Sequence, residues 1–373
     1  MTITRRAAGI ALAAAVLAGS IASPATAATA LPALDPARLT AAIAGLPDAQ
    51  VSGALVQIRG SGGSWSGSSG ISELGSTAPP RLDGRFRIGS MTKTFTAVVT
   101  LQLAAERRLN LDQPVQRYLP GLLPASYAPI PVRSLLNFTS GINGAGIDSK
   151  NPDWFFPNRY QHFEPGSQLD FTKPLAFDPG KAQRYGNADY ILAGLLIEKV
   201  TGNSWASEIN RRIIRPLHLT GTSVPGDDPR IHGPHAHGYE ATDTGWVDVT
   251  EANPSLQWSA ASIISTADDL DRFLVALFRG RLLPPRQLEE MFTVPDVDIY
   301  GTDKDAVYSA GLTEFQSGTQ TIWVKSGDRP GYNNAMGATR DLSRRLVYSV
   351  NTLHMGGTES PKAAERIVMA ALT

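Results

Sequence analysis

Cysteine is missing from all 373 residues of this chain. Its absence excludes disulfide bonds, thiolate metal sites, a cysteine nucleophile and lipid attachment through a lipobox cysteine. It does not argue against export, because a domain of this size can be stabilised by its core alone.

The chain also lacks a net charge, since 34 Lys and Arg residues balance 34 Asp and Glu residues. No overall field attracts polyanions, so we expect neither nucleic acid nor an anionic membrane surface as a partner. Beyond the N-terminal region, no apolar run reaches the length of a membrane span. Hydrophobic residues make up 42% of the chain, which is enough for a large core in one large or two ordinary domains.

Residues 1–27 have the features of a signal peptide. A basic start, MTITRR, precedes the apolar AAGIALAAAVLAGSIA, and the ATA that ends at Ala27 suits a signal peptidase. The alternative is a membrane anchor, for which the apolar run is short. We therefore expect a secreted protein that begins near Ala28 and has no membrane span after signal removal.

Periodicity predicts strands near both ends of the chain and helices between them. Strands are expected at 52–60, 64–72, 307–315, 320–327, 333–340 and 346–352. Helices are expected at 36–46, 95–106, 188–201 and 361–372, with a short one within 131–142 and another within 265–280 that Ser265 or Thr266 caps.

The predicted fold class is α/β of the α+β type, an antiparallel sheet flanked by helices with an inserted all-helical domain. Residues 28–86 and 260–373 would form the sheet domain and residues 87–259 the mostly helical domain. The active site would lie between the two.

A serine and a lysine stand three residues apart in RIGSMTKTFTAVVTLQL, residues 87–103. If Ser90 opens a helix, Lys93 lies one turn further on the same face, within reach of the serine hydroxyl. Free N–H groups at the helix start and apolar neighbours such as Phe95 would activate this pair, because an apolar setting lowers the pKa of a lysine. The ordinary alternative is that Ser90 caps the helix and Lys93 lies on the surface.

The segment RYGNADY places Tyr185 and Asn187 two residues apart, immediately before a helix. In an extended segment such residues point to the same side. A phenol there can relay a proton, and a carboxamide can bind a substrate amide or hold the lysine. Otherwise Asn187 caps the helix and Tyr185 packs in the core.

The segment WVKSGDRPGY places Lys325, Ser326 and Gly327 at a strand end. A glycine there lets a peptide-like substrate lie against the strand edge.

In this order, Ser90-x-x-Lys93, Tyr185-x-Asn187 and Lys325-Ser-Gly327 resemble the three motifs of penicillin-recognising serine hydrolases. The chain is most similar to secreted actinomycete D-alanyl-D-alanine carboxypeptidases, and more distantly similar to class C β-lactamases and related esterases. Blocks such as LLNFTSG, LAGLLIEKVTGNS and IISTADDLDRFLVAL extend the resemblance over most of the mature chain. It implies a β-lactamase/transpeptidase-like fold.

The resemblance also implies an activity, that of a secreted serine D-alanyl-D-alanine carboxypeptidase. Ser90 would attack the peptide carbonyl, Lys93 would help to remove its proton, and Tyr185 would protonate the departing amine and later activate water. Main-chain N–H groups of Ser90 and Asp328 would form the oxyanion hole. Expected partners are a peptidoglycan stem peptide or another small acyl substrate, with β-lactams as inhibitors and with no metal or other cofactor.

The chain departs from those carboxypeptidases in how it would bind a carboxylate. They usually read His-Thr-Gly-Thr in the third motif and carry an arginine on the preceding strand. Here Thr313 stands about where that arginine would fall, and Asp328 would repel a carboxylate. Arg329 could take over the role, or it could simply pair with Asp328 in a solvated turn. An esterase or β-lactamase on the same scaffold is therefore the alternative function.

Other residues invite weaker hypotheses. Trp258 either lines the substrate cleft or belongs to the core. His232, His235 and His237 have spacings that a metal could use, but they lie in a Gly/Pro-rich loop without a matched carboxylate, so we expect no zinc site. A non-catalytic β-lactam or muropeptide receptor is disfavoured, because a receptor does not need Tyr185.

Overall fold

The computed structural model describes residues 31–144, 147, 149–355 and 360–372. The predicted signal peptide lies outside these residues. Within them, no helix combines the length and apolarity that crossing a bilayer requires.

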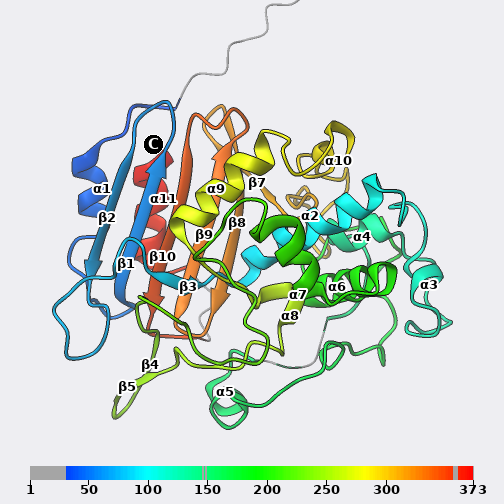
Figure 1. Ribbon diagram of the computed structural model, residues 1–373, viewed down its shortest axis with the longest axis horizontal. Helices are drawn as coiled ribbons and strands as arrows, with labels where there is room; N and C mark the ends of the chain where they lie inside the picture. The colour runs from blue at the N-terminus through cyan, green and yellow to red at the C-terminus, as the bar shows by residue number, and fades with distance from the viewer. Residues whose placement is uncertain (1–30, 145–146, 148, 356–359, 373) are drawn as a thin grey trace, which may run out of the picture.

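A six-stranded antiparallel sheet joins the two ends of the chain (Figure 1). The N-terminal hairpin of β1 (Val51–Arg59) and β2 (Trp65–Gly70) pairs with the last strand, β10 (Arg345–Thr352). The order is β2-β1-β10-β9-β8-β7, with β7 at Thr313–Ser317, β8 at Gln320–Arg329 and β9 at Tyr332–Thr339. The predicted fold class is confirmed.

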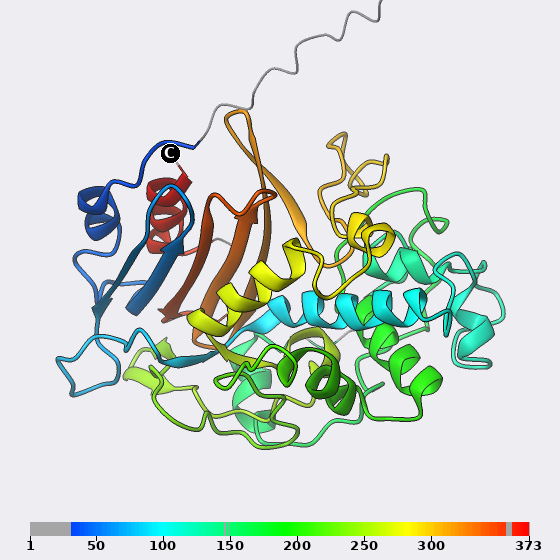
Figure 2. The same ribbon diagram turned by 45° about the horizontal axis from the view of Figure 1, so that its top comes forward.

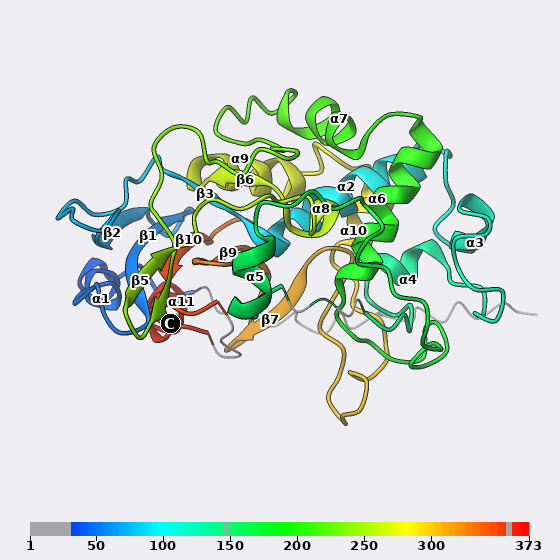
Figure 3. The same ribbon diagram turned by 90° about the horizontal axis from the view of Figure 1, so that it is seen from below.

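Helices cover both faces of this sheet (Figure 3). On β1, Ala54, Val56 and Ile58 pack in one cluster with α1 (Pro36–Ala42) and α11 (Lys362–Leu372), whereas Leu55 belongs to the core on the other face. This alternation is the period of two that a strand buried on both faces must have. On the second face α9 (Ala267–Phe278) lies against β9 and β10.

The helix α2 (Thr92–Ala105) runs through the middle of the helical region (Figure 2). Every residue from Thr92 to Leu101 is buried, as the apolar pattern on most sides of this helix predicts. It contacts α6 (Asn187–Thr201), α7 (Trp205–Ile209), α8 (Trp258–Ala261) and α10 (Pro285–Glu290). A helix that is surrounded in this way gives the residues at its N-terminus a fixed position.

The helix ends follow their local sequence signals. The helix α6 ends at Gly202, whose φ of 74° is the left-handed conformation that glycine adopts most readily. The side chain of Thr266 accepts a hydrogen bond from the main-chain N–H of Asp269, so Thr266 rather than Ser265 caps α9.

The strand predicted at 307–315 begins only at Thr313. The main-chain N–H groups of Val307 and Tyr308 donate to Gln183 Oε1, and Gln183 Nε2 donates to the Tyr308 carbonyl. A buried side chain therefore takes the hydrogen bonds that a neighbouring strand would have taken.

The remaining elements are short. The helices are α3 (Val115–Tyr118), α4 (Val132–Leu136) and α5 (Pro152–Asn158), and π-helical hydrogen bonds span Asn210–Ile214. Two-stranded sheets form from β3 (Arg85–Arg87) with β6 (Ile264–Thr266) and from β4 (Tyr239–Thr242) with β5 (Gly245–Asp248). The division into domains at 86/87 and 259/260 stays a prediction.

Candidate active site

Ser90 lies in a single 3₁₀ turn, Gly89–Met91, that leads directly into α2. One turn further on, Lys93 is fully buried, and its Nζ lies 3.1 Å from Ser90 Oγ. The ordinary alternative, in which Lys93 lies on the surface, is therefore wrong. A serine hydroxyl in contact with a buried amine is the arrangement that activates a nucleophile.

Two fixed acceptors orient the amine of Lys93. Nζ donates to Asn187 Oδ1 at 2.7 Å and to the carbonyl oxygen of Ala260 at 3.1 Å. Burial, and secondarily the positive charge of Lys325, hold the pKa of Lys93 well below its usual value. A neutral amine has two N–H groups, which these acceptors occupy, so its lone pair is left for the proton of Ser90.

Tyr185 closes the other side of Ser90. Its ring is tilted against those of Phe138 and Tyr308, with centroids 4.6 Å and 5.4 Å away, and Lys93 Nζ lies 5.0 Å from its centroid. Tyr185 keeps 37% of its surface exposed, but the surrounding protein desolvates its hydroxyl group. This burial raises the pKa of Tyr185, and a hydrogen bond with Ser90 offsets only part of the rise. The phenol is therefore protonated at neutral pH and can give a proton to a leaving group.

The strand β8 presents the third motif along an open edge. Its neighbour β7 pairs with β8 from Gln320 to Val324, so no strand of the described residues covers that edge between Lys325 and Arg329. Lys325 is buried, and its Nζ donates to the carbonyl oxygen of Ser326 at 3.0 Å and lies 5.1 Å from the centroid of the Tyr185 ring. Burial lowers the pKa of Lys325 to about 8, and the charge of Asp328 opposes this only in part.

Two glycines let β8 approach the nucleophile closely. A Cβ atom on Gly327 would lie 2.0 Å from the carbonyl oxygen of Ile88 and 2.8 Å from the main-chain nitrogen of Ser90. A Cβ atom on Gly89, whose φ is 54°, would lie 2.6 Å from the main-chain nitrogen of Asp328. The two main-chain amides that the resemblance assigns to the oxyanion hole therefore lie close together, and their role stays a prediction.

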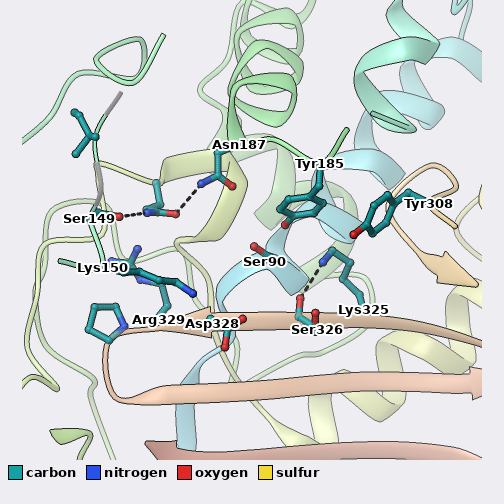
Figure 4. A pocket seen from close by; sticks show the side chains of 13 residues that line it. Ser90, Ser149, Lys150, Tyr185, Asn187, Tyr308, Lys325, Ser326, Asp328 and Arg329 are labelled. Carbon is teal, nitrogen blue, oxygen red and sulfur yellow. Dashed lines mark hydrogen bonds between the residues drawn. The ribbon is translucent and has the colours of Figure 1, made fainter. Parts of the chain in front are cut away.

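One pocket contains most of the residues that the sequence singled out (Figure 4). Its lining includes Ser90, Tyr185, Asn187, Lys325, Ser326, Asp328 and Arg329, with Lys93 directly below Ser90. The structure adds Ile147, Ser149, Lys150, Gln257, Tyr308 and Pro330, which the sequence did not single out.

Trp258 is not among the residues that line this pocket, so the hypothesis of a cleft tryptophan needs correction. Its ring packs edge-on at 5.8 Å against the buried Trp205, and it occupies the space that Gly194 leaves, where a Cβ atom would lie 2.7 Å from the indole. The preceding residue, Gln257, lines the pocket instead and receives a hydrogen bond from Asn187 Nδ2 at 3.4 Å.

Arg329 does not pair with Asp328, which corrects the alternative of a solvated ion pair. Only 8% of the Arg329 side chain is exposed, and none of the ion pairs among the described residues joins it to Asp328. Asp328 Oδ1 instead accepts a hydrogen bond of 2.5 Å from Asn333 Nδ2 on the neighbouring strand β9.

A buried carboxyl group escaped the sequence analysis. Asp189, in the first turn of α6, is 2% exposed and accepts a hydrogen bond from Ser140 Oγ at 2.5 Å. Burial raises its pKa to about 7, although Ser140 and the charge of Lys93 oppose the rise. Its position two residues after Asn187 in the second motif was the available signal.

The three loop histidines bind separate partners. His232 and His237 contact Asp228 and Asp248, each at 2.6 Å, and His235 contacts the carbonyl oxygen of Gly233. Within the part of the chain that the structure describes, no three His, Asp or Glu side chains are grouped so as to hold a metal ion.

A serine next to a buried lysine with a lowered pKa and a tyrosine, at the edge of an antiparallel sheet, defines the class of penicillin-recognising serine hydrolases. The profile of the beta-lactamase family matches residues 39–370, and the chain belongs to this family. It is thus a serine acyl-enzyme hydrolase of the superfamily that includes β-lactamases and penicillin-binding proteins.

Individual relatives fall into two groups. Penicillin-binding protein 4* of Bacillus subtilis (strain 168) is 27% identical over 323 residues, which are 80% of this chain and 68% of that protein. The solved D-stereospecific amidohydrolase from Streptomyces sp. is 33% identical, with a TM-score of 0.78 over 90% of this chain and 98% of that one. The D-amino acid amidase from Ochrobactrum anthropi SV3, complexed with D-phenylalanine, is 25% identical, with a TM-score of 0.74 over 90% of this chain and 98% of that one.

Proposed function

We propose that this protein is a secreted serine hydrolase that cleaves the amide bond on the carbonyl side of a D-amino acid residue. The observation that carries the proposal is the amine of Lys93, which lies 3.1 Å from Ser90 Oγ and donates to Asn187 Oδ1 and to the carbonyl oxygen of Ala260. The D-configuration is supported by the similarity to a D-stereospecific amidohydrolase and a D-amino acid amidase.

The proton transfers in this proposal balance over one cycle. Ser90 Oγ bonds to the substrate carbonyl carbon while its proton passes to Lys93. Tyr185 gives its proton to the departing nitrogen, and the carbon–nitrogen bond breaks. Water then attacks the ester on Ser90 and returns a proton to the oxygen of Tyr185, while Lys93 returns the serine proton. The acyl product leaves as an acid.

The narrower form of this function is the D-alanyl-D-alanine carboxypeptidase expected from the sequence. Lys325 supports it, because this buried cation lies beside Tyr185, where the departing D-alanine would place its carboxylate. Peptidoglycan stem peptides are then the substrates, and β-lactams are inhibitors that acylate Ser90.

The second candidate is a D-amino acid amidase or esterase, whose leaving group carries no carboxylate. Thr313 favours it, because this half-buried residue lies on β7 outside the pocket lining and supplies no charge where related carboxypeptidases carry an arginine. The 33% identity to an amidohydrolase points the same way.

A panel of matched substrates tests the proposal and separates the two forms. We would measure kcat/KM for N-acetyl-D-Ala-D-Ala, for D-alanine amide and for a D-alanine ester, each beside its L-alanine counterpart. The proposal expects a preference for the D-form and complete loss of turnover in Ser90→Ala. Faster hydrolysis of the L-forms, or turnover that survives Ser90→Ala, would refute it. A preference for the dipeptide selects the carboxypeptidase, and a preference for the amide or ester selects the second candidate.

A further inference from the structure

Arg329 is a buried cation without a partner. No hydrogen bond or ion pair of its side chain occurs among the described residues, and its Nε atom is fully buried and unsatisfied. Burial and the nearby charge of Arg87 lower the pKa of Arg329 to about 9. An unpaired buried charge is strongly destabilising, and its presence in a pocket is explained if a ligand supplies the missing anion.

Among the residues that the structure describes, the charged groups around Arg329 do not supply this anion. Arg87 is itself positive and donates to the carbonyl oxygens of Thr250 and Pro229. Asp328 is bound to Asn333, and Lys150 adds a second positive charge to the lining of the pocket. No carboxylate among the described residues is therefore paired with Arg329.

The pocket has two ends, which lie on opposite sides of Ser90. Figure 4 places Tyr185, Tyr308 and Lys325 on one side and Lys150 and Arg329 on the other. Aromatic and cation–ring contacts of 5.4 Å and 5.1 Å hold the first group together.

The second end continues along Gln257, which hydrogen-bonds to both Asn187 and Ser149. Because Tyr185 protonates the departing nitrogen, the leaving group occupies the end that contains Tyr185. The acyl group must then extend past Asn187 toward Arg329.

We propose that Arg329 binds an anionic group on the acyl part of the substrate, so that the enzyme selects acyl donors that carry a carboxylate there. This inference rests on the proposed function and adds the chemical class of the acyl donor. On sequence grounds, Arg329 was considered as the partner of the carboxylate on the leaving group. We assign that carboxylate to Lys325 instead.

The test uses pairs of substrates that differ only in one acyl-side charge. N-succinyl- and N-glutaryl-D-alanine p-nitroanilide carry a carboxylate, and N-acetyl-D-alanine p-nitroanilide does not, while the leaving group is the same and neutral. We expect the wild-type enzyme to prefer a carboxylated substrate by about 10- to 100-fold in kcat/KM, the effect of a charge-assisted hydrogen bond. In Arg329→Gln this ratio should fall to near one, and in Arg329→Lys it should be intermediate.

The matched control is Arg117→Gln, which removes an exposed arginine whose side chain hydrogen-bonds to Gln113, away from the pocket lining. It should keep the wild-type ratio. A wild-type enzyme without a preference, or a preference that Arg329→Gln leaves intact, would overturn the proposal. Circular dichroism checks that each variant is folded. The substrate preference of the wild-type enzyme is decisive without any variant.

A binding measurement keeps this inference separate from the proposed function. Isothermal titration of Ser90→Ala protein with N-succinyl- and N-acetyl-D-alanine needs no turnover. Tighter binding of the succinyl compound, lost in Ser90→Ala/Arg329→Gln, supports the anion site even if no D-residue amide is hydrolysed. Equal binding of both compounds contradicts it even if hydrolysis occurs.

Discussion

Replacing Lys93 by methionine removes the amine of a fully buried side chain but keeps most of its length and volume. Burial holds the pKa of Lys93 well below its usual value, whereas the unfolded chain regains a pKa near 10.4. Between the two values the unfolded state binds about one more proton than the folded state. The free energy of unfolding of the wild type therefore rises with pH in this window, by about 1.4 kcal/mol per unit.

Lys93→Met lacks this contribution. The difference between the unfolding free energies of the wild type and the variant should thus rise by about 1.2 kcal/mol from pH 9 to pH 10, because the unfolded lysine begins to lose its proton near pH 10. The depressed pKa of Lys325 is common to both proteins and cancels in this difference. Urea denaturation followed by tryptophan fluorescence measures it. Lys199→Met, an exposed position on α6, is the control and should show no such slope.

The same variant tests the role of the amine in catalysis. Without a general base, acylation of Ser90 by a fluorescent penicillin should slow by about 100- to 10,000-fold, while circular dichroism stays unchanged. A wild-type acylation rate in Lys93→Met, or equal slopes of unfolding free energy in both proteins, would show that this lysine is neither neutral nor a base.

Three further predictions follow from the site and the chain start. Tyr185→Phe should slow deacylation by about 100-fold or more and leave a penicilloyl-enzyme that mass spectrometry detects; wild-type turnover would rule out the proton relay. The pKa of about 8 for Lys325 predicts that kcat/KM for a D-Ala-D-Ala peptide falls above pH 8, because the lysine loses its charge, whereas kcat/KM for a neutral p-nitroanilide does not; parallel profiles would contradict carboxylate binding by Lys325. N-terminal sequencing of protein from the culture medium should start near Ala28, and a start at Met1 on membranes would contradict secretion.

Sequence reasoning succeeded where a few neighbouring residues determine the outcome. Ser90 and Lys93 are one helical turn apart, so their contact follows from helix geometry once α2 is recognised. Gly202 ends α6 because glycine readily adopts the left-handed conformation, and Thr266 begins α9 because its side chain accepts a hydrogen bond from the first turn.

Sequence reasoning fell short where the position of a residue depends on side chains that are distant in the sequence. Tyr308 enters the pocket because Gln183, over 100 residues earlier, holds its main chain. Whether Trp258 or Gln257 faces the pocket depends on the space left by Gly194 in another helix. None of these long-range contacts has a local sequence signal.

The pairing of β1 with β10 has a consequence for how this protein becomes active. The nucleophile is synthesised early, but the strand edge that completes its pocket is built from β8, which is held in the sheet through β9 and β10. A chain still emerging from the ribosome already contains Ser90, Lys93 and Tyr185, but it lacks the edge of β8 that completes their pocket. The acylation of Ser90 that we propose for penicillins would therefore report that the last strands have joined the first.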